Sequence, residues 1–487
     1  ALREAVEAAN TDADFSDCVA TGVYGADEIS FDQSLSGIVL LTSQFEILDD
    51  LQITGNDAII LRSSGSSRIF FINGNGLSVI LAGLNMRDGL TSGQGGCVRM
   101  AGESTLLRTE DARFDSCISG ASGGAIAIGQ SLTVRSEGSR GQPPTRLEII
   151  RTQFVSNESR PQSSQAQGGA IYAGSDPVEM EIEDSRFVAN VAFGSNAATA
   201  AGGALYGVDI VNLQINRSEF TNNRATAFEN NATGGAIFIE SQNGPALLGN
   251  TTITRNLARG GGSSNEARGG ALFITLPDPD QSFELVNLTI FDNESVVADD
   301  AIAFSGGIEL IFDLEGFISN TILAGNVTRS LDPMSGEPQP SDCLFEGNFQ
   351  SRGHNIIETN CGLTAAIGDQ FGVDPLLEPL ADNGGAIEGM LSYLPSLVSP
   401  AIDAANPGPV QPSVDPPACL ADDQRGIVRP FDAGGGPVCD IGAIEVEREP
   451  IPPSLSVPVL APAGLIGLML FMMIAGCWAV SSRLPSV

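Results

Sequence analysis

The chain contains no lysine, and this absence narrows the partners that it can have. All 24 basic residues are arginines, they face 59 acidic residues, and the formal net charge is −35. Duplex DNA, RNA and anionic membrane surfaces are bound through a basic footprint, which this composition does not provide. A dense acidic surface instead keeps a protein soluble and attracts cations. We therefore predict no nucleic-acid partner.

Residues and motifs that usually hold metals are scarce. His354 is the only histidine, and none of the eight cysteines falls in a CxxC or zinc-type pattern. The EF-hand loop and the glycine-rich calcium-binding nonapeptide are also missing. Acidic loops could still hold calcium weakly through carboxylate and carbonyl oxygens. We predict no cofactor, and we leave weak surface calcium binding open.

Aromatic residues are few and long apolar runs of helical period are rare, but short motifs recur at a fixed period. The motif GGA begins at Gly123, Gly168, Gly202, Gly234 and Gly269, with degenerate forms at Gly95 and Gly306. Each full copy is paired with an apolar residue that an asparagine follows three positions later. The closing asparagines are Asn157, Asn190, Asn223, Asn256 and Asn293, and Asn326 closes a looser copy. Most are 33 residues apart, and such a period predicts an array of stacked units.

The pattern inside one unit indicates β-strands. In residues 178–184, Val178, Met180 and Ile182 alternate with glutamates, which is the period of a strand with one buried face. An apolar residue five positions before each key apolar residue implies a bend between two short strands. The GGA segment supplies a third strand, because its glycines allow a sharp corner and close backbone approach. We predict an all-β parallel solenoid with three short strands per coil, and variable loops at 193–201, 227–233 and 258–268.

The repeated asparagines have two interpretations. At the same place in successive coils they can form a side-chain ladder that hydrogen-bonds one coil to the next. Alternatively, they form a row of ligands for a bound molecule. We favour the structural ladder, formed by Asn157, Asn190, Asn223, Asn256, Asn293 and Asn326.

The repeats and the first residues resemble two families of bacterial surface proteins. The paired GGA and apolar-x-x-Asn motifs resemble the repeats of polymorphic outer-membrane proteins and related adhesins, which implies a right-handed parallel β-helix. The opening ALREAVEAAN is similar to the CSLREA domain. The leading cysteine of that pattern is missing, so we expect the natural chain to begin earlier and Cys18 to lack a partner here. The matching positions are Leu2, Arg3, Glu4, Ala5, Ala8, Ala9 and Asn10.

Residues 353–445 resemble the choice-of-anchor Q domain, which implies a position just before a cell-surface sorting signal. The matching segments are GHNII (353–357), VDPLL (373–377), LADNGG (380–385), SPAID (399–403), DQRGIVRP (423–430) and CDIGAIE (439–445). Independently of this resemblance, Cys343 with Cys361 and Cys419 with Cys439 are spaced like local loop disulfides. Cys97 with Cys117 is a third candidate pair, and this usage fits an oxidising, secreted environment.

The end of the sequence is a candidate membrane anchor. No charge interrupts residues 457–480, and a helix of this length would span about 36 Å, enough for a hydrocarbon core of about 30 Å. The segment is similar to IPTL-type carboxy-terminal sorting signals, which implies either processing by a sortase-like protease or retention as a plain anchor. Valines replace the expected isoleucine and threonine, and one arginine replaces a basic cluster. The motif residues are Val457, Pro458, Val459, Leu460, Pro462 and Arg483.

These observations predict a chain of five parts. They are a CSLREA-like cap (1–38), β-helix repeats (39–335), choice-of-anchor Q-like terminal coils and cap (336–447), a Pro-rich spacer (448–456) and the transmembrane sorting segment (457–483). The expected location is the cell surface or outer envelope of a bacterium, with the protein either anchored or released after tail processing.

We expect the activity to be non-catalytic adhesion to an extracellular glycan or another cell-surface ligand. The first alternative is a polysaccharide lyase or glycoside hydrolase, which needs a base beside calcium or paired carboxylates. The second is a self-associating surface-layer component. For the enzyme, candidate carboxylates occur on the strand at 178–184 and also at Asp278, Asp280, Glu309, Asp313 and Glu315. A solvated acidic face is the better explanation of these residues, so we assign no catalytic residue.

Overall fold

The computed structural model describes most of residues 1–447. Residues 22–24, 26, 130–142, 163, 175–176, 197, 241–243, 263–264, 277–281, 299–300, 333–336, 408–418 and 431–437 are not described, nor are the side chains of 276 and 312–315. The spacer 448–456, the apolar segment 457–483 and the six sorting-motif residues also lie outside the described residues. Ala1–Val446 form one compact unit. No helix among the described residues is long and apolar enough to span a membrane.

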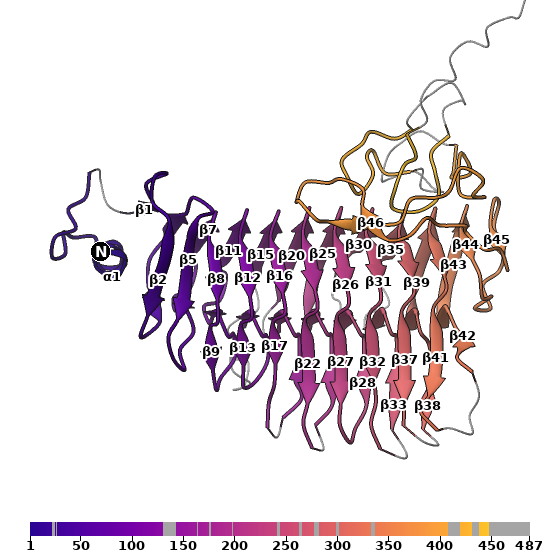
Figure 1. Ribbon diagram of the computed structural model, residues 1–487, viewed down its shortest axis with the longest axis horizontal. Coiled ribbons are helices and arrows are strands. Elements are labelled where there is room, and N and C mark those ends of the chain that lie inside the picture. The colour runs from indigo at the N-terminus through magenta and orange to yellow at the C-terminus, as the bar shows by residue number, and fades with distance from the viewer. Residues whose placement is uncertain are drawn as a thin grey trace, which may run out of the picture. The chain divides into compact units, whose positions relative to one another are not determined.

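The unit is a solenoid whose strands stack in parallel from coil to coil (Figure 1). A central coil contains five short strands, namely β24 (Leu205–Gly207), β25 (Ile210–Asn216), β26 (Glu219–Thr221), β27 (Arg224–Ala227) and β28 (Ala232–Thr233). Three strands were expected, so this detail of the prediction was wrong. The two additional strands, β27 and β28, lie in or next to a segment predicted as a loop. They form because the backbone there continues to pair with the neighbouring coils.

The first strand of each coil belongs to the glycine ladder, whose strands from β10 onward follow the GGA motif or one of its degenerate forms. Gly202 has a φ of +63°, which favours glycine. A Cβ on Gly203 would lie 2.0 Å from the carbonyl oxygen of Gly235 in the next coil, so only glycine fits. The strands are β3 (Phe45–Ile47), β6 (Phe70–Ile72), β10 (Val98–Met100), β14 (Ile126–Ile128), β19 (Ile171–Ala173), β24, β29 (Ile237–Ile239), β34 (Leu272–Leu276) and the start of β39 (Ile308–Ser319).

The second strand belongs to the acidic ladder, and it shows the predicted alternation. In β20, Val178, Met180 and Ile182 are buried, while the three glutamates between and after them face outward. Its strands are β1 (Asp27–Ser30), β4 (Leu51–Thr54), β7 (Ser78–Ala82), β11 (Leu106–Glu110), β15 (Thr145–Ile150), β20 (Val178–Glu183), β25, β30 (Ala246–Gly249), β35 (Phe283–Val286), the end of β39 and β43 (Cys343–Gly353). Because β39 and β43 run through both ladders, the two form one 19-stranded sheet.

The third strand belongs to the phenylalanine ladder, which spans 12 coils in parallel register. At about 4.8 Å per coil, the eleven intervals give a rod of about 53 Å. The rings of Phe154, Phe187 and Phe220 stack in the core with centroids 4.7 and 4.5 Å apart. The strands are β2 (Gly37–Leu41), β5 (Ile59–Ser63), β8 (Asn85–Arg87), β12 (Arg113–Asp115), β16 (Gln153–Val155), β21 (Arg186–Val188), β26, β31 (Thr252–Thr254), β36 (Thr289–Phe291), β40 (Ile322–Ala324), β44 (Ile356–Ile357) and β45 (Gln370–Phe371).

The fourth and fifth strands complete the coil. The arginine ladder contains β9 (Leu90–Thr91), β13 (Ile118–Ser119), β17 (Glu158–Ser159), β22 (Val191–Gly194), β27, β32 (Leu257–Arg259), β37 (Glu294–Val297), β41 (Val327–Ser330) and the antiparallel β42 (Gln339–Pro340). The short ladder contains β18 (Ala166–Gln167), β23 (Ala200–Ala201), β28, β33 (Glu266–Arg268) and β38 (Ile302–Ala303).

A single residue makes the bend between the acidic and phenylalanine strands of a coil. Asp184 and Arg217 occupy this place in successive coils with φ of 52° and 47°, and Asn250 follows with 45°. One left-handed residue turns the chain and explains why the two apolar positions are five residues apart. Arg217 also pairs with Asp184 at 2.7 Å, so the bend is tied to its neighbour.

Helix α1 (Leu2–Thr11) closes the amino-terminal end of the core. Its Val6 and Ala9 are buried against the first coils. Arg3 donates to the carbonyl oxygen of Ser43 at 2.8 Å, and Asn10 both donates to Glu46 and accepts from the amide of Leu48 at 2.8 Å. These contacts occupy the edge of β3 and prevent it from pairing with another chain.

The carboxy-terminal part of the unit leaves the coil stack after β45. Residues 372–446, which we call the flank segment, turn back and lie along the outer side of the phenylalanine ladder, over β26, β31 and β36 (Figure 1). The segment contains one short antiparallel pair, β46 (Ala381–Asp382) and β47 (Leu391–Ser392). We predicted that residues 336–447 form terminal coils and a cap. Among the described residues that follow, β43, β44 and β45 continue the parallel ladders, and β42 pairs antiparallel with β41.

Candidate binding surface

The six repeated asparagines form one buried row inside the rod. In the centre, the Oδ1 of Asn223 accepts from the backbone amide and the Nδ2 of Asn190, at 3.1 and 2.9 Å. The Nδ2 of Asn223 donates to the carbonyl oxygen of Phe187 and to the Oδ1 of Asn256. The same bonds link Asn157, Asn190, Asn223, Asn256, Asn293 and Asn326 in order. All six are at most 1% exposed, so they connect coils and cannot contact a ligand from solvent.

The asparagine row ends at residues that are not asparagines. At its amino-terminal end, the backbone amide of Cys117 donates to the Oδ1 of Asn157 at 3.0 Å. At the other end, Asp342 accepts from the backbone amide and the Nδ2 of Asn326 at 3.0 and 2.9 Å. A carboxylate suits the last position because it accepts hydrogen bonds and has no amide hydrogens to satisfy.

A second buried row, formed by serine and threonine hydroxyls, was not predicted from the sequence. Ser185 accepts from the amide of Thr152, Ser218 from Ser185 and Thr251 from Ser218, at 3.0 to 3.3 Å. Each hydroxyl also donates to the carbonyl oxygen of the residue two positions earlier in the sequence. The signal was present, because a Ser or Thr stands two positions before each key apolar residue in these four repeats.

Three disulfides connect parts of the unit. Cys343 is bonded to Cys361 and Cys419 to Cys439. Cys97 is bonded to Cys117 inside the rod, beside the first position of the asparagine row. Cys18 is a free, half-buried thiol whose sulfur lies 3.7 Å from the carbonyl oxygen of Ala1. Cys477 lies outside the described residues.

The acidic ladder presents the densest set of outward charges. Arg146 pairs with Glu148 at 2.7 Å in its own strand and with Glu179 at 3.4 Å in the next coil. Glu183 pairs with Arg217 at 2.7 Å. Glu181 makes no ion pair within the described part of the chain. Its pKa is raised by burial first and then by the charges of Glu183 and Glu148.

A small hollow lies over this face. Its volume is about 40 Å³, which holds roughly three water molecules. Sites for small organic ligands usually measure about 300–1,000 Å³, so the hollow is far too small to enclose a sugar ring. Its polar lining consists of Arg146, Glu148, Glu179, Glu181, Asn212 and Gln214.

Among the other candidate carboxylates, the structure describes the side chain of Glu309. Glu309 is fully buried and paired with Arg268, whose guanidinium stacks 3.9 Å from the ring centre of Phe304. Burial raises the pKa of Glu309 to about 7, although Arg268 opposes the shift. Asp278, Asp280 and the side chains of Asp313 and Glu315 lie outside the described residues. Among the described residues, no group of three or more His, Cys, Asp or Glu side chains could hold a metal ion. Weak calcium binding stays a prediction.

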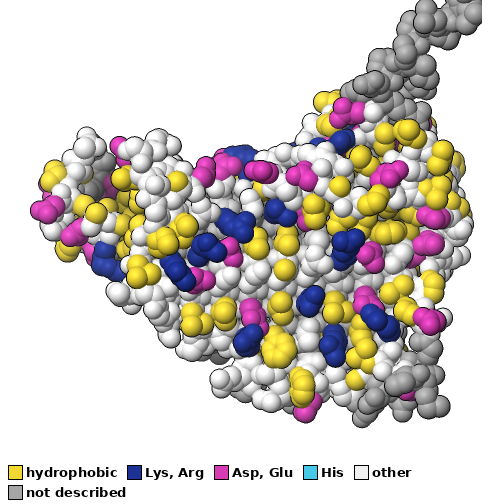
Figure 2. Space-filling view, in the orientation of Figure 1, with side chains coloured by type: hydrophobic (Ala, Val, Ile, Leu, Met, Phe, Trp, Pro, Cys, Tyr) yellow, Lys and Arg dark blue, Asp and Glu magenta, His cyan; other side chains and the backbone are white. Residues whose placement is uncertain are grey.

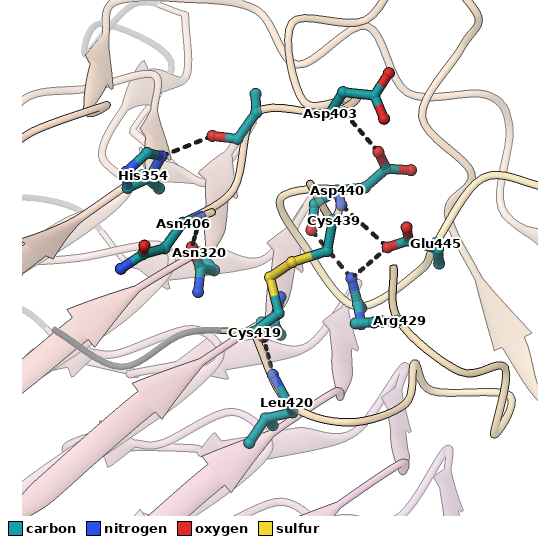
Figure 3. Close-up of a disulfide and its surroundings, with 12 residues drawn as sticks. Asn320, His354, Asp403, Asn406, Cys419, Leu420, Arg429, Cys439, Asp440 and Glu445 are labelled. Carbon is teal, nitrogen blue, oxygen red and sulfur yellow. Dashed lines mark hydrogen bonds and ion pairs between the residues drawn. A yellow bond between two sulfur atoms is a disulfide. The ribbon is translucent and has the colours of Figure 1, made fainter. Parts of the chain in front are cut away.

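The flank segment is attached through polar groups that face outward from the rod (Figure 3). Asn287 accepts from the amide of Leu420 at 3.0 Å, and Asn320 accepts from the amide of Asn406 at 2.9 Å. The ring Nδ1 of His354 lies 2.8 Å from the carbonyl oxygen of Ala404. The single histidine therefore connects the last coils to the flank segment.

Two of the quoted terminal motifs meet inside the flank segment. Arg429, from 423–430, is fully buried and pairs with Glu445, from 439–445, at 3.1 Å. It also donates to the carbonyl oxygen of Asp440 at 3.0 Å (Figure 3). Burial, reinforced by the charge of Glu445, raises the pKa of Asp440 to about 6. This buried network holds the segment together beside the Cys419 disulfide.

The chain was compared with known proteins in three ways. No protein-family model, no curated protein and no solved structure matches it.

Proposed function

We propose that this chain is an exported, right-handed parallel β-helix of the bacterial cell surface that binds extracellular glycan or another cell-surface ligand without cleaving it. The proposal includes the CSLREA-like cap, the polymorphic-type repeats, the choice-of-anchor Q-like segment and the sorting signal at 457–483. The tail would anchor the rod in the membrane or be cut by a sortase-like protease. The rod would then hold its outer faces away from the envelope.

The observation that carries this proposal is the form of the acidic face. Polar side chains repeat there at the coil spacing of about 4.8 Å, and the hollow among them measures about 40 Å³. A hydrolytic site needs groups that converge on one bond of the substrate. A flat, repeating row of carboxylates, amides and guanidinium groups instead suits many weak contacts along a polymer.

The test is to incubate the full chain in mild detergent with acidic and neutral polysaccharides, with and without calcium. Retention without new chain ends is the expected result. New reducing ends or unsaturated products would contradict the proposal.

A hydrolase or lyase is the second candidate, and one contact favours it. Glu181 lies next to Glu148 in the adjoining strand, and burial raises its pKa, as a general acid requires. If cleavage is seen, Glu181→Gln should abolish it, and Glu158→Gln in the arginine ladder should not. The third candidate, a self-associating surface layer, predicts concentration-dependent growth of the sedimentation coefficient instead.

A further inference from the structure

Two arginines stand out in a chain with a large excess of acid. Arg224 in β27 and Arg259 in β32 are exposed, and neither makes an ion pair or hydrogen bond within the described part of the chain. Other exposed arginines on the same side are paired, such as Arg62 with Asp88 at 2.6 Å and Arg255 with Asp292 at 3.2 Å. With 59 acidic residues available, two unpaired guanidinium groups indicate a place kept free for an external anion.

The two arginines lie close together on the arginine ladder. Arg224 is in register with Leu257, and Thr226 is in register with Arg259. The arginines are therefore one coil and two residues apart, which puts their Cα atoms roughly 8 Å from each other. Phe228, which follows β27, is 66% exposed. The patch thus combines two free cations with apolar surface.

The arginine ladder as a whole also differs in charge from the rest of the rod. Its strands carry the outward-facing Arg224, Arg259 and Arg329 against Glu158 and Glu294, and Arg160 directly follows β17. Both glutamates pair with arginines of the same ladder. Arginines spread over the side of the rod that this ladder shares with the phenylalanine ladder (Figure 2).

We propose that the patch around Arg224 and Arg259 binds an anionic polysaccharide, one that carries carboxylate or sulfate groups. The inference rests on the proposed glycan-binding function, and it adds a second contact face on the arginine ladder, separate from the acidic face, together with the class of glycan bound there. Guanidinium groups bind carboxylate and sulfate oxygens through paired, charge-assisted hydrogen bonds. An extended chain can place successive anions against both arginines and lay a sugar ring on Phe228, which lies two residues beyond the position in register with Arg259.

A thin chain fits this patch better than a second copy of the protein. The Debye length is about 8 Å at physiological ionic strength, so a chain lying on this face is screened from acidic groups on the other faces. A second copy carries a net charge of −35 over a broad surface, so the part of it that packs around the patch would bring acidic groups of the two copies within that distance. Long-range repulsion would then oppose association.

The experiment is affinity electrophoresis of the full chain in mild detergent, through gels containing polygalacturonate, dextran sulfate or neutral dextran. The variant is Arg224→Gln with Arg259→Gln. The matched control is Arg62→Gln with Arg255→Gln, which removes the same charge from paired arginines. We expect the anionic polymers to retard the wild type. We expect the variant to bind roughly tenfold more weakly and the control to change by less than about twofold.

The outcomes separate this inference from the proposed function. Equal weakening by both double variants would show general charge attraction and overturn the inference. Retardation by neutral dextran alone would also overturn it, while leaving glycan binding intact. Binding to none of the three polymers would overturn the inference and also contradict the glycan-binding part of the proposed function. If sedimentation velocity shows self-association that only Arg224→Gln with Arg259→Gln removes, the patch binds a second copy and the inference is wrong.

Discussion

Replacing Asn223 by alanine should destabilise the centre of the rod by about 3–5 kcal/mol. The side chain is fully buried and takes part in four hydrogen bonds with three residues. Alanine would leave the backbone amide and one side-chain hydrogen of Asn190 without acceptors, and it would remove a donor from the carbonyl oxygen of Phe187. Each buried polar group left unpaired costs about 1–3 kcal/mol. The Oδ1 of Asn256 keeps one bond, from the backbone amide of Asn223, so its loss is smaller.

The assay is urea unfolding followed by circular dichroism, with Asn212→Ala as the matched control. Asn212 faces outward on β25 in the same coil, and its removal should change the free energy of unfolding by less than about 0.5 kcal/mol. Because repeat proteins can unfold in parts, amide hydrogen exchange should accompany the measurement. Exchange should speed up most in the coils next to Asn223. Equal stability of the two variants would refute the view that the asparagine row holds the coils together.

Three further predictions follow from the structure. Gly203→Ala should prevent stable folding, because its Cβ would lie 2.0 Å from a carbonyl oxygen, whereas Gly65→Ala has open space and should express normally. Burial raises the pKa of Glu309 to about 7, so the folded state binds its proton more tightly than the unfolded state. Its contribution to stability is complete below pH 4.5 and is lost as the pH rises through 7, and Glu309→Gln should flatten this part of a stability–pH curve. Replacing both cysteines of the Cys97 disulfide, whose partners are 20 residues apart, by alanine should lower the urea-unfolding free energy by about 3 kcal/mol.

Much of the coil could be predicted because the signals are local. The alternation of buried and outward residues in β20 indicates directly that the strand has one buried face. The glycine pair at Gly202 marks a corner that no other residue can form. The strands in the predicted loops were missed because they are only two to four residues long. Ala200–Ala201 has no alternation to detect, and it becomes a strand only when the neighbouring coil pairs with it.

The flank segment shows what local patterns do not reveal. In β31, Thr252 and Thr254 are both buried, although their alternation suggests an exposed face. Thr252 bonds to Gln424 and Thr254 lies 3.1 Å from the hydroxyl of Tyr393, residues more than a hundred positions away. Nothing in the sequence near β31 specifies that a distant segment covers it.

By itself, the sequence determined the parallel solenoid, its period and the residues that face the core. Stacking places similar residues on similar neighbours, so the same local preference for a strand or a corner recurs in every coil. Only the tertiary structure decided which charges stay free. Arg62 and Arg224 are both exposed arginines on short strands, yet one meets an aspartate of the next coil and the other does not. That difference depends on the register between coils, which brings together side chains distant in sequence. The same register defines the patch around Arg224 and Arg259.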